Sequence, residues 1–286
     1  MKNKYKGITL IILAALFFSL MATTVKSVNE FPLIQKVFFR NFIGVIILSF
    51  YVVKDKSILK INNKVLMFGR CAFGLTGVFL YYKSLGLLDL SEAVVINKLS
   101  PFFVIVLGGL VLKEKIKTSQ FIAVFIALGG IVVLLRPQMS IDIMPAIIGL
   151  LGALSAAGAY TIIRELRHSD KPTTIVFYFC LSSTLVTLPF LLNNFMMPTW
   201  MQLFQLCMIG IFALIAQLLM TNAYRYAPAS QLSIYTYLNI IFSALWGVLF
   251  WSESLSSTFI IGAGLIILAG FINFYTANRK SVSDIF

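Results

Sequence analysis

The sequence predicts an all-α membrane protein with ten transmembrane helices. The first observation is composition: 59% of the 286 residues are hydrophobic and only 12% are charged, whereas a soluble domain carries roughly 25% charged residues. The second is a succession of apolar runs long enough to cross a bilayer, with a mean hydropathy of +0.94 over the chain. The third is a similarity between the two halves of the chain. Together these features predict two five-helix units.

Each predicted span is an apolar run that ends at charged residues, Pro or Asn. A helix needs about 20 such residues to cross the hydrocarbon core. The first run follows a basic start, as in a secretory signal, but it is longer than the apolar region of a signal peptide and is interpreted as a helix. Because the connections are short, consecutive helices are expected to be antiparallel. The spans are 8–25, 34–53, 67–87, 91–112, 119–135, 145–164, 174–193, 203–222, 230–251 and 257–276.

The distribution of basic residues predicts the orientation in the membrane. Of the 23 Lys and Arg residues, 17 fall at one side of the predicted bundle, together with both termini. Short cytoplasmic loops carry an excess of Lys and Arg. We therefore expect both termini in the cytoplasm and the protein in the inner or plasma membrane.

The second half aligns with the first at an offset of 139 residues. An odd number of spans in each half inverts the second half relative to the first, and inverted repeats commonly build transporters with a site near the midplane. A chance likeness between apolar helices is the alternative. The aligned pairs are Ser91 with Ser230, Leu99 with Leu238, Gly108 with Gly247, and Glu114 with Glu253.

Several motifs resemble a known transporter family. "FFRN", "GRCAFGLTGVFLYYKSLGLLDLSEAVVINKLSPFFV", "GGIVVLLRP", "AQLLMTNAYRYAPAS" and "FWSE" are similar to the EamA-type repeats of the drug/metabolite transporter superfamily. The resemblance implies a first repeat at 7–136 (spans 1–5), a second at 145–276 (spans 6–10), and transport of a small metabolite. The branch that it indicates includes S-adenosylmethionine and riboflavin transporters.

Lys98 is the principal candidate for substrate contact. It lies seven residues after Ser91, about 10 Å below the outer boundary at 1.5 Å per residue. A cation costs about 2.5–3.5 kcal/mol at the centre of a membrane helix on insertion scales. Snorkelling to the headgroups is the structural alternative. However, Asn97 adds a side-chain amide beside it. Pro101 leaves the backbone carbonyl of Asn97 free, because a proline cannot donate a backbone hydrogen bond. We therefore expect Lys98 to line a polar cavity.

The other candidate residues are polar side chains within the spans. The predicted substrate-binding set is Lys98, Asn97, Tyr82, Tyr160, Gln217 and Tyr237, with Tyr81, Lys83 and Asn222 as further candidates. A helix-packing role is the alternative for each tyrosine or amide. Arg40 and Arg136 are expected to snorkel to the outer surface, while Glu114 and Glu253 are expected to stabilise helix ends.

The lysines favour a solute with a carboxylate, and the tyrosines favour one with a planar group. An amino acid or amino-acid derivative, including one like S-adenosylmethionine, is therefore the first expectation for the substrate. A nucleoside-like compound or flavin vitamin is the second. A membrane scaffold that transports nothing is the alternative from another class.

Other function classes lack their motifs. The sequence contains no zinc-protease, nucleophile-elbow or phosphate-loop motif, and its one histidine, His168, lies in a predicted loop. We expect no enzyme activity, no metal and no cofactor. The net charge of +13 is spread over short loops, so we expect no nucleic-acid partner, while a homodimer is compatible with the sequence. The cysteines, Cys71, Cys180 and Cys207, show no metal-binding spacing and are expected to be inert.

Overall fold

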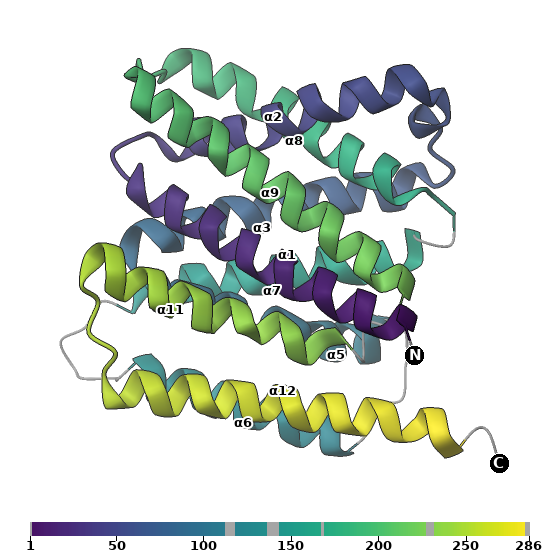
Figure 1. Ribbon diagram of the computed structural model, residues 1–286, viewed down its shortest axis with the longest axis vertical. Coiled ribbons are helices and arrows are strands. Elements are labelled where there is room, and N and C mark those ends of the chain that lie inside the picture. The colour runs from purple at the N-terminus through teal and green to yellow at the C-terminus, as the bar shows by residue number, and fades with distance from the viewer. Residues whose placement is uncertain (1, 112–117, 136–142, 167–168, 227–231, 284–286) are drawn as a thin grey trace.

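A computed structural model describes residues 2–111, 118–135, 143–166, 169–226 and 232–283. These residues form helices joined by short turns (Figure 1). In chain order the helices are α1 Lys2–Ser27, α2 Leu33–Lys54, η1 Lys56–Leu59, α3 Lys64–Leu87, α4 Leu90–Asn97, α5 Ser100–Val111, α6 Thr118–Leu135, α7 Met144–Leu166, α8 Pro172–Asn193, α9 Trp200–Tyr226, η2 Ser233–Tyr237, α11 Leu238–Trp251 and α12 Ser257–Ser283.

The predicted membrane spans are confirmed with one refinement. In the described part of the chain, nine segments are long and apolar enough to cross a membrane, and α6 supplies a shorter tenth helix. The refinement concerns the fourth and ninth predicted spans, which are not continuous α-helices. The fourth consists of α4 and α5, and the ninth contains the 3-10 helix η2 followed by α11.

The packing of the helices shows the two inverted repeats. Under the repeat, α1 corresponds to α7, α2 to α8, α3 to α9, and α6 to α12. The main contacts come in matching pairs: α1 packs on α9 as α7 packs on α3, and α1 packs on α11 as α7 packs on α5. The corresponding helices α2 and α8 pack on each other, and so do α6 and α12. Figure 1 shows these pairs as successive layers, with α2 and α8 at one edge and α6 and α12 at the other.

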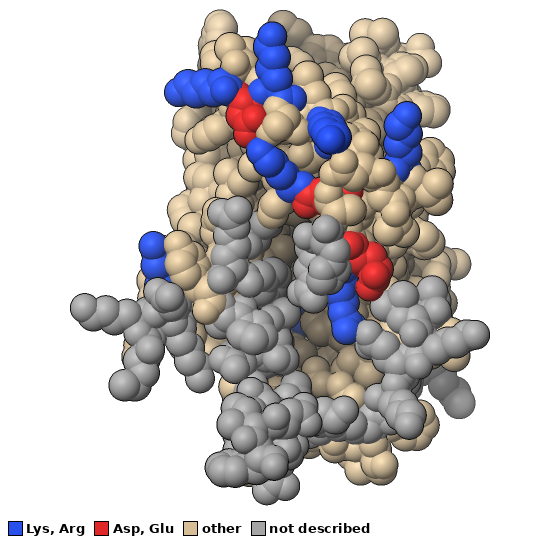
Figure 2. Space-filling view, turned by 90° about the vertical axis from the view of Figure 1, so that its right-hand side faces the viewer, with Lys and Arg blue, Asp and Glu red and all other residues tan. Residues whose placement is uncertain are grey.

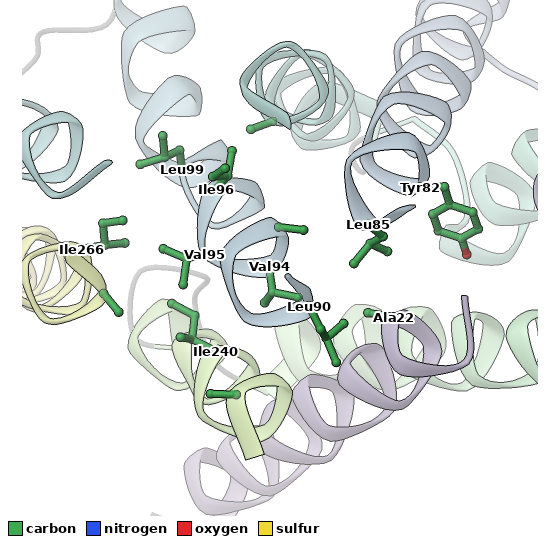
Figure 3. Close-up of a cluster of buried hydrophobic side chains, with 14 of the residues drawn as sticks. Ala22, Tyr82, Leu85, Leu90, Val94, Val95, Ile96, Leu99, Ile240 and Ile266 are labelled. Carbon is green, nitrogen blue, oxygen red and sulfur yellow. The ribbon is translucent and has the colours of Figure 1, made fainter. Parts of the chain in front are cut away.

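The largest apolar cluster lies where the two repeats meet. Figure 3 shows its centre, in which Leu90, Val94 and Val95 of α4 lie between α3 and α11. Each of these three side chains is inaccessible to solvent. The helix α4 is therefore fixed on several sides by apolar packing, which positions both of its ends.

Glycines bring two helix pairs into backbone contact. A Cβ atom at Gly77 of α3 would lie 3.1 Å from the backbone nitrogen of Ala156 in α7. A Cβ atom at Gly262 of α12 would lie 2.6 Å from the carbonyl oxygen of Gly130 in α6. Such close approach is the usual device for helix association in lipid. These glycines hold the two repeats together.

One end of the bundle carries a concentration of basic side chains. Figure 1 shows that α1 begins and α12 ends at the same end, and Figure 2 shows Lys and Arg side chains gathered on part of that end. Exposed lysines of this end include Lys54, Lys56, Lys60, Lys64 and Lys171. Asp55 forms an ion pair of 3.0 Å with Lys171, which joins the η1 region to the start of α8. The loops of the two repeats are thus tied at this end.

Candidate functional site

Both repeats contain an interrupted helix at the corresponding position. The helix α4 ends at Asn97, and α5 begins at Ser100. Between them, the backbone N–H of Leu99 donates to the carbonyl of Ile96 at 3.0 Å, a tighter turn than an α-helix makes. In the second repeat, η2 gives way to α11 at Leu238, which is 139 residues after Leu99. Interrupted helices of this kind form the central sites of many transporters.

Two buried arginines approach the same aromatic ring from different helices. Arg40 of α2 is 7% exposed and Arg70 of α3 is 4% exposed. Their guanidinium carbons lie 5.3 and 4.2 Å from the ring centroid of Phe179 in α8. Arg40 lies seven residues into α2 and Arg70 six residues into α3. These antiparallel helices start at opposite ends of the bundle, so each arginine begins roughly 10 Å from one end and reaches toward the middle.

This arginine pair lacks an acidic counterpart among the described residues. Arg40 donates one hydrogen bond, from Nη1 to the side-chain oxygen of Asn41 at 2.8 Å. The Nε atom of Arg40 and the Nε and Nη1 atoms of Arg70 are buried without a hydrogen-bond partner in the described part of the chain. Buried charges in proteins are normally paired or hydrogen-bonded. A buried cation–π contact contributes about 2 kcal/mol, less than the several kcal/mol that desolvation of an unpaired ion costs, so the pair is an unbalanced positive site.

The second repeat supplies most of the wall around Arg40. A cavity of about 10 Å³ adjoins this guanidinium, enough for about one water molecule. Its lining includes Phe179 and Cys180 of α8 and Gln217 of α9. At Gly44 of α2, a Cβ atom would come within 2.8 Å of the Cys180 sulfur, so α8 approaches α2 closely here. The site is thus closed, and it lies between the two repeats.

Three of the predicted substrate-binding residues lie at this site. Tyr82 is 1% exposed. It interacts electrostatically with Arg40, and Tyr160 interacts with Arg70. Gln217 lines the cavity. The side chains of Tyr82, Tyr160 and Gln217 therefore come together around the arginine pair, although the sequence did not connect them with it.

The other three predicted residues lie at the helix interruptions. Asn97 and Lys98 are half-buried at the turn between α4 and α5. Tyr237 is buried at the end of η2, where its ring lies 6.4 Å from that of Phe102 and packs on Gly270. Lys98 and Tyr237 occupy equivalent positions in the two repeats. No contact between this group and the arginine pair is found in the described part of the chain.

The structure corrects five expectations about polar residues. Lys83, Asn222 and Tyr160 are exposed and not buried. Arg40 does not snorkel to the outer surface, because its side chain is buried against Phe179. Arg70, one of the 17 basic residues assigned to the cytoplasmic side, also has a buried side chain. Arg40 follows the two phenylalanines of "VFFR", and Arg70 precedes the glycines of "RCAFGLTG", in helices that contain no acidic residue. Arg136, Glu114 and His168 lie outside the described residues.

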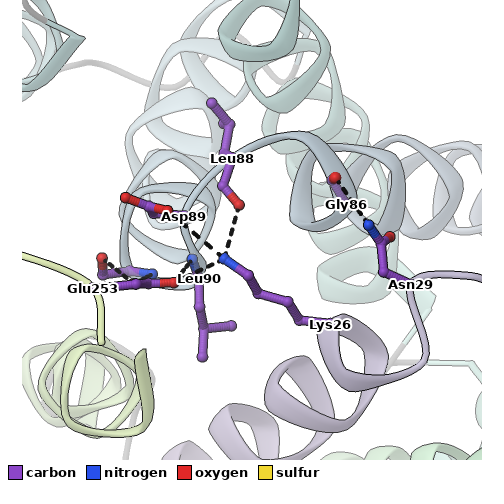
Figure 4. Close-up of polar contacts among 8 residues, drawn as sticks. Lys26, Asn29, Gly86, Leu88, Asp89, Leu90 and Glu253 are labelled. Carbon is purple, nitrogen blue, oxygen red and sulfur yellow. Dashed lines mark hydrogen bonds and ion pairs between the residues drawn. The ribbon is translucent and has the colours of Figure 1, made fainter. Parts of the chain in front are cut away.

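Glu253 stabilises a helix end, as expected, and it does so across the repeat boundary (Figure 4). One carboxylate oxygen accepts hydrogen bonds from Lys26 Nζ at 2.8 Å and from the backbone N–H of Leu90 at 2.6 Å. The other accepts from the hydroxyl of Ser91 at 2.9 Å and from its backbone N–H at 3.3 Å. Lys26 also donates to the carbonyl oxygen of Leu88 at 3.1 Å. We call these five residues the Glu253 cluster.

The turn before Glu253 directs its side chain toward α4. Ser252 has φ = 53°, the left-handed conformation, and ends α11. The Glu253 side chain then folds back over Gly247, where a Cβ atom would collide with the carboxylate. Lys26 completes the arrangement from α1, with its ammonium 5.5 Å from the ring centroid of Trp251. Three helices, α1, α4 and α11, are therefore joined at one point.

The charges of the cluster affect the acidity of Glu253 and of the neighbouring Asp89. Burial raises the pKa of Glu253, but hydrogen bonds from Lys26, Leu90 and Ser91 outweigh this effect, and the pKa lies below its ordinary value. Asp89 lies 3.9 Å from Lys26 and is more exposed. Burial and the neighbouring charge of Glu253 raise the pKa of Asp89. The negative charge that neutralises Lys26 is therefore mainly that of Glu253.

Comparison with known proteins identifies the fold and the general function. The model of the EamA-like transporter family matches residues 5–136 and 143–275. The chain is 31% identical over 266 residues to a protein named Pseudopaline exporter CntI from Pseudomonas aeruginosa, covering 92% of this chain and 94% of that protein. It is 24% identical over 249 residues to an S-adenosylmethionine uptake transporter from Rickettsia prowazekii, covering 86% of this chain and 84% of the other.

A solved structure shows the same fold over almost the whole chain. A protein of known crystal structure superposes with a TM-score of 0.69 and 20% sequence identity, covering 97% of this chain and 99% of the other. With two family matches that span the two halves, and relatives that are named transporters, the functional class is established. This chain is a multi-pass membrane transporter and belongs to the EamA-like transporter family of the drug/metabolite transporter superfamily.

Proposed function

We propose that this transporter carries an amino acid or amino-acid derivative whose carboxylate binds at the arginine pair. The observation that supports this proposal is the burial of Arg40 and Arg70 without an acidic partner among the described residues. A guanidinium matches the planar geometry of a carboxylate and forms strong charge-assisted hydrogen bonds with it. An anionic substrate would supply the negative charge that this site lacks.

The surroundings of the pair fit the organic part of such a substrate. Phe179, Val176 and Leu214 present apolar surface beside Arg40, and the cavity also reaches Gln217. Ligand sites commonly combine apolar walls with a few polar groups that fix orientation. Two relatives are named for pseudopaline and for S-adenosylmethionine. Their names support a metabolite of this general kind, while one is named an exporter and the other an uptake transporter.

We further propose that the two repeats alternate the access of this site. The cavity beside Arg40 is too small for a metabolite, so the helices must separate before a substrate can enter. In the proposed orientation, with both termini in the cytoplasm, the Glu253 cluster closes the outer end. The inverted repeats provide two related packings of the same elements, which is the basis of alternating access in such transporters.

A transport assay tests the role of the arginine pair. Purified protein is reconstituted into liposomes and supplied with labelled amino acids, S-adenosylmethionine, nucleosides and riboflavin. We expect uptake of an amino acid or derivative, and we expect Arg70→Met to abolish it. The matched control is Lys64→Met, which removes a positive charge from an exposed position on the same helix and should leave transport unchanged.

Each result bears on the proposal. Transport of riboflavin or a nucleoside alone would show that the substrate is a flavin vitamin or nucleoside-like compound and not an amino acid. Equal transport by wild type and the correctly folded Arg70→Met variant would show that the arginine pair does not bind substrate. An absence of flux for every compound, with folded protein confirmed by size-exclusion chromatography, would also contradict the proposal.

A further inference from the structure

We infer that the substrate carries at least two carboxylates, one for each guanidinium of the arginine pair. This inference rests on the proposed function and specifies its substrate class. The argument begins with charge. The helices that carry or wall the pair, α2, α3, α8 and α9, contain no Asp or Glu at all. The helix α7, which brings Tyr160 to Arg70, contains one acidic residue, Glu165, and its side chain is exposed. The two buried positive charges therefore have no buried negative charge on these helices, and a substrate with two carboxylates would supply both.

The unpaired donors belong to both arginines. Among the residues that the structure describes, the Nε atom of Arg40 and the Nε and Nη1 atoms of Arg70 have no hydrogen-bond partner. One carboxylate has two oxygens and accepts about four hydrogen bonds. However, these donors belong to two separate helices, and each guanidinium is held in its own position against Phe179. One carboxylate therefore does not reach the donors of both arginines with good hydrogen-bond geometry.

The spacing and lining of the site favour two carboxylates joined by a carbon chain. Both guanidinium carbons lie within cation–π range of the same ring, so they are at most about 10 Å apart. The surface beside Arg40 includes Val176, Ala213 and Leu214. A compact ion such as phosphate would bring its charge but would leave these apolar groups without contact. A dicarboxylic amino acid or a larger amino-dicarboxylate satisfies both features.

The inference predicts strong discrimination between a dicarboxylate and its amide. Glutamate and glutamine have nearly the same size, and so do aspartate and asparagine, but each acid has one more carboxylate than its amide. A site with one guanidinium for each carboxylate loses a charge-assisted interaction with the amide and leaves one arginine buried and unpaired. We expect the acid of each pair to bind at least tenfold more tightly than the amide.

Thermal unfolding of the purified transporter in detergent measures this preference. The midpoint is recorded against increasing glutamate, glutamine, aspartate, asparagine and inorganic phosphate, because a ligand that binds only the folded protein raises it. We expect the two acids to raise the midpoint at concentrations at which the amides and phosphate have no effect. Arg40→Met and Arg70→Met should each reduce binding of the acids to the level of the amides. Arg70→Lys should retain part of it, because it keeps the charge but loses the planar donor geometry.

The outcomes separate this inference from the proposed function. Equal stabilisation by acid and amide, stabilisation by phosphate as strong as by the acids, or no stabilisation by any of the five compounds would overturn the inference. The liposome assay is run in parallel with the same compounds. If a monocarboxylic amino acid is transported and its transport requires Arg70, the proposed function stands and the dicarboxylate requirement is wrong. If transport occurs but depends on neither arginine, both are wrong.

Discussion

Substitution of Glu253 by Gln should destabilise the folded transporter by about 1–3 kcal/mol. Gln keeps the shape of the side chain and an oxygen that can accept from Leu90 or Ser91, but it removes the charge that neutralises Lys26. A hydrogen bond to a charged group contributes about 1.5–3 kcal/mol, against 0.5–1.5 for a neutral one. Glu253→Ala, which removes all four interactions and leaves Lys26 without its principal partner, should cost more, about 3–5 kcal/mol.

Asp89→Asn provides the matched control. Asp89 is near the same ammonium, at 3.9 Å, but its side chain is 55% exposed, whereas that of Glu253 is 3% exposed. Exposed pairs contribute about 0–1 kcal/mol. Thermal unfolding followed by tryptophan fluorescence should therefore give the order Glu253→Ala, then Glu253→Gln, then Asp89→Asn, from most to least destabilised. A Glu253→Gln variant as stable as the wild type would refute this account of the cluster. An Asp89→Asn variant that is destabilised as much as Glu253→Gln would also refute it.

The contribution of Glu253 should also depend on pH. Its pKa is lowered in the folded protein from an ordinary value of 4.5, so the folded state binds a proton less readily than the unfolded state. The contribution is therefore fully present above about pH 5 and is lost as the pH falls through the folded pKa. The difference in stability between wild type and Glu253→Gln should shrink between pH 5 and pH 3. A difference that is constant over this range would contradict the assigned charge.

Three other predictions concern packing, charge burial and access. Gly262→Ala should destabilise the protein by about 1–3 kcal/mol in a denaturation experiment, because its Cβ would meet the carbonyl of Gly130; Gly264→Ala, with open space around it, should be neutral or slightly stabilising. Arg70→Met should raise the free energy of unfolding in the absence of substrate by about 1 kcal/mol or more, because desolvating an unpaired charge costs several kcal/mol and the cation–π contact returns about 2; a destabilised variant would contradict the unbalanced charge. In a cysteine-free background, Ser91→Cys should react faster with a membrane-impermeant maleimide when Glu253→Gln is also present, since the Glu253 cluster buries Ser91.

Much of the fold could be predicted from sequence because the membrane leaves few alternatives. Backbone groups within lipid must be satisfied internally, so apolar runs of sufficient length become helices. The repeat offset placed Leu99 over Leu238, and the structure interrupts both helices next to these residues. The sequence did not reveal the interruptions themselves. They depend on whether a few residues adopt a 3-10 turn, which tertiary packing decides.

The arginine pair was missed because a hydropathy profile records position along the chain and not direction across a helix. Arg40 and Arg70 lie near the ends of their spans, where a long side chain normally reaches the headgroups. Their side chains instead converge on Phe179, a contact between α2, α3 and α8 that pairs elements from both repeats. Tyr82 and Gln217 could be predicted as polar residues within spans, because that prediction needs only their position along the chain. Their association with the two arginines needs the three-dimensional arrangement.

Ser252 has a consequence for how easily the closed end can reopen. A left-handed backbone costs a residue other than glycine about 1–2 kcal/mol, and Ser252 adopts this conformation at the turn that carries Glu253. Relaxation of that single residue would recover this energy and swing the carboxylate away from Leu90 and Ser91. The closure is therefore weaker than its four hydrogen bonds suggest. In the proposed transport cycle, a small rotation of the backbone at Ser252 would release the carboxylate of Glu253 while the helices on either side stay intact.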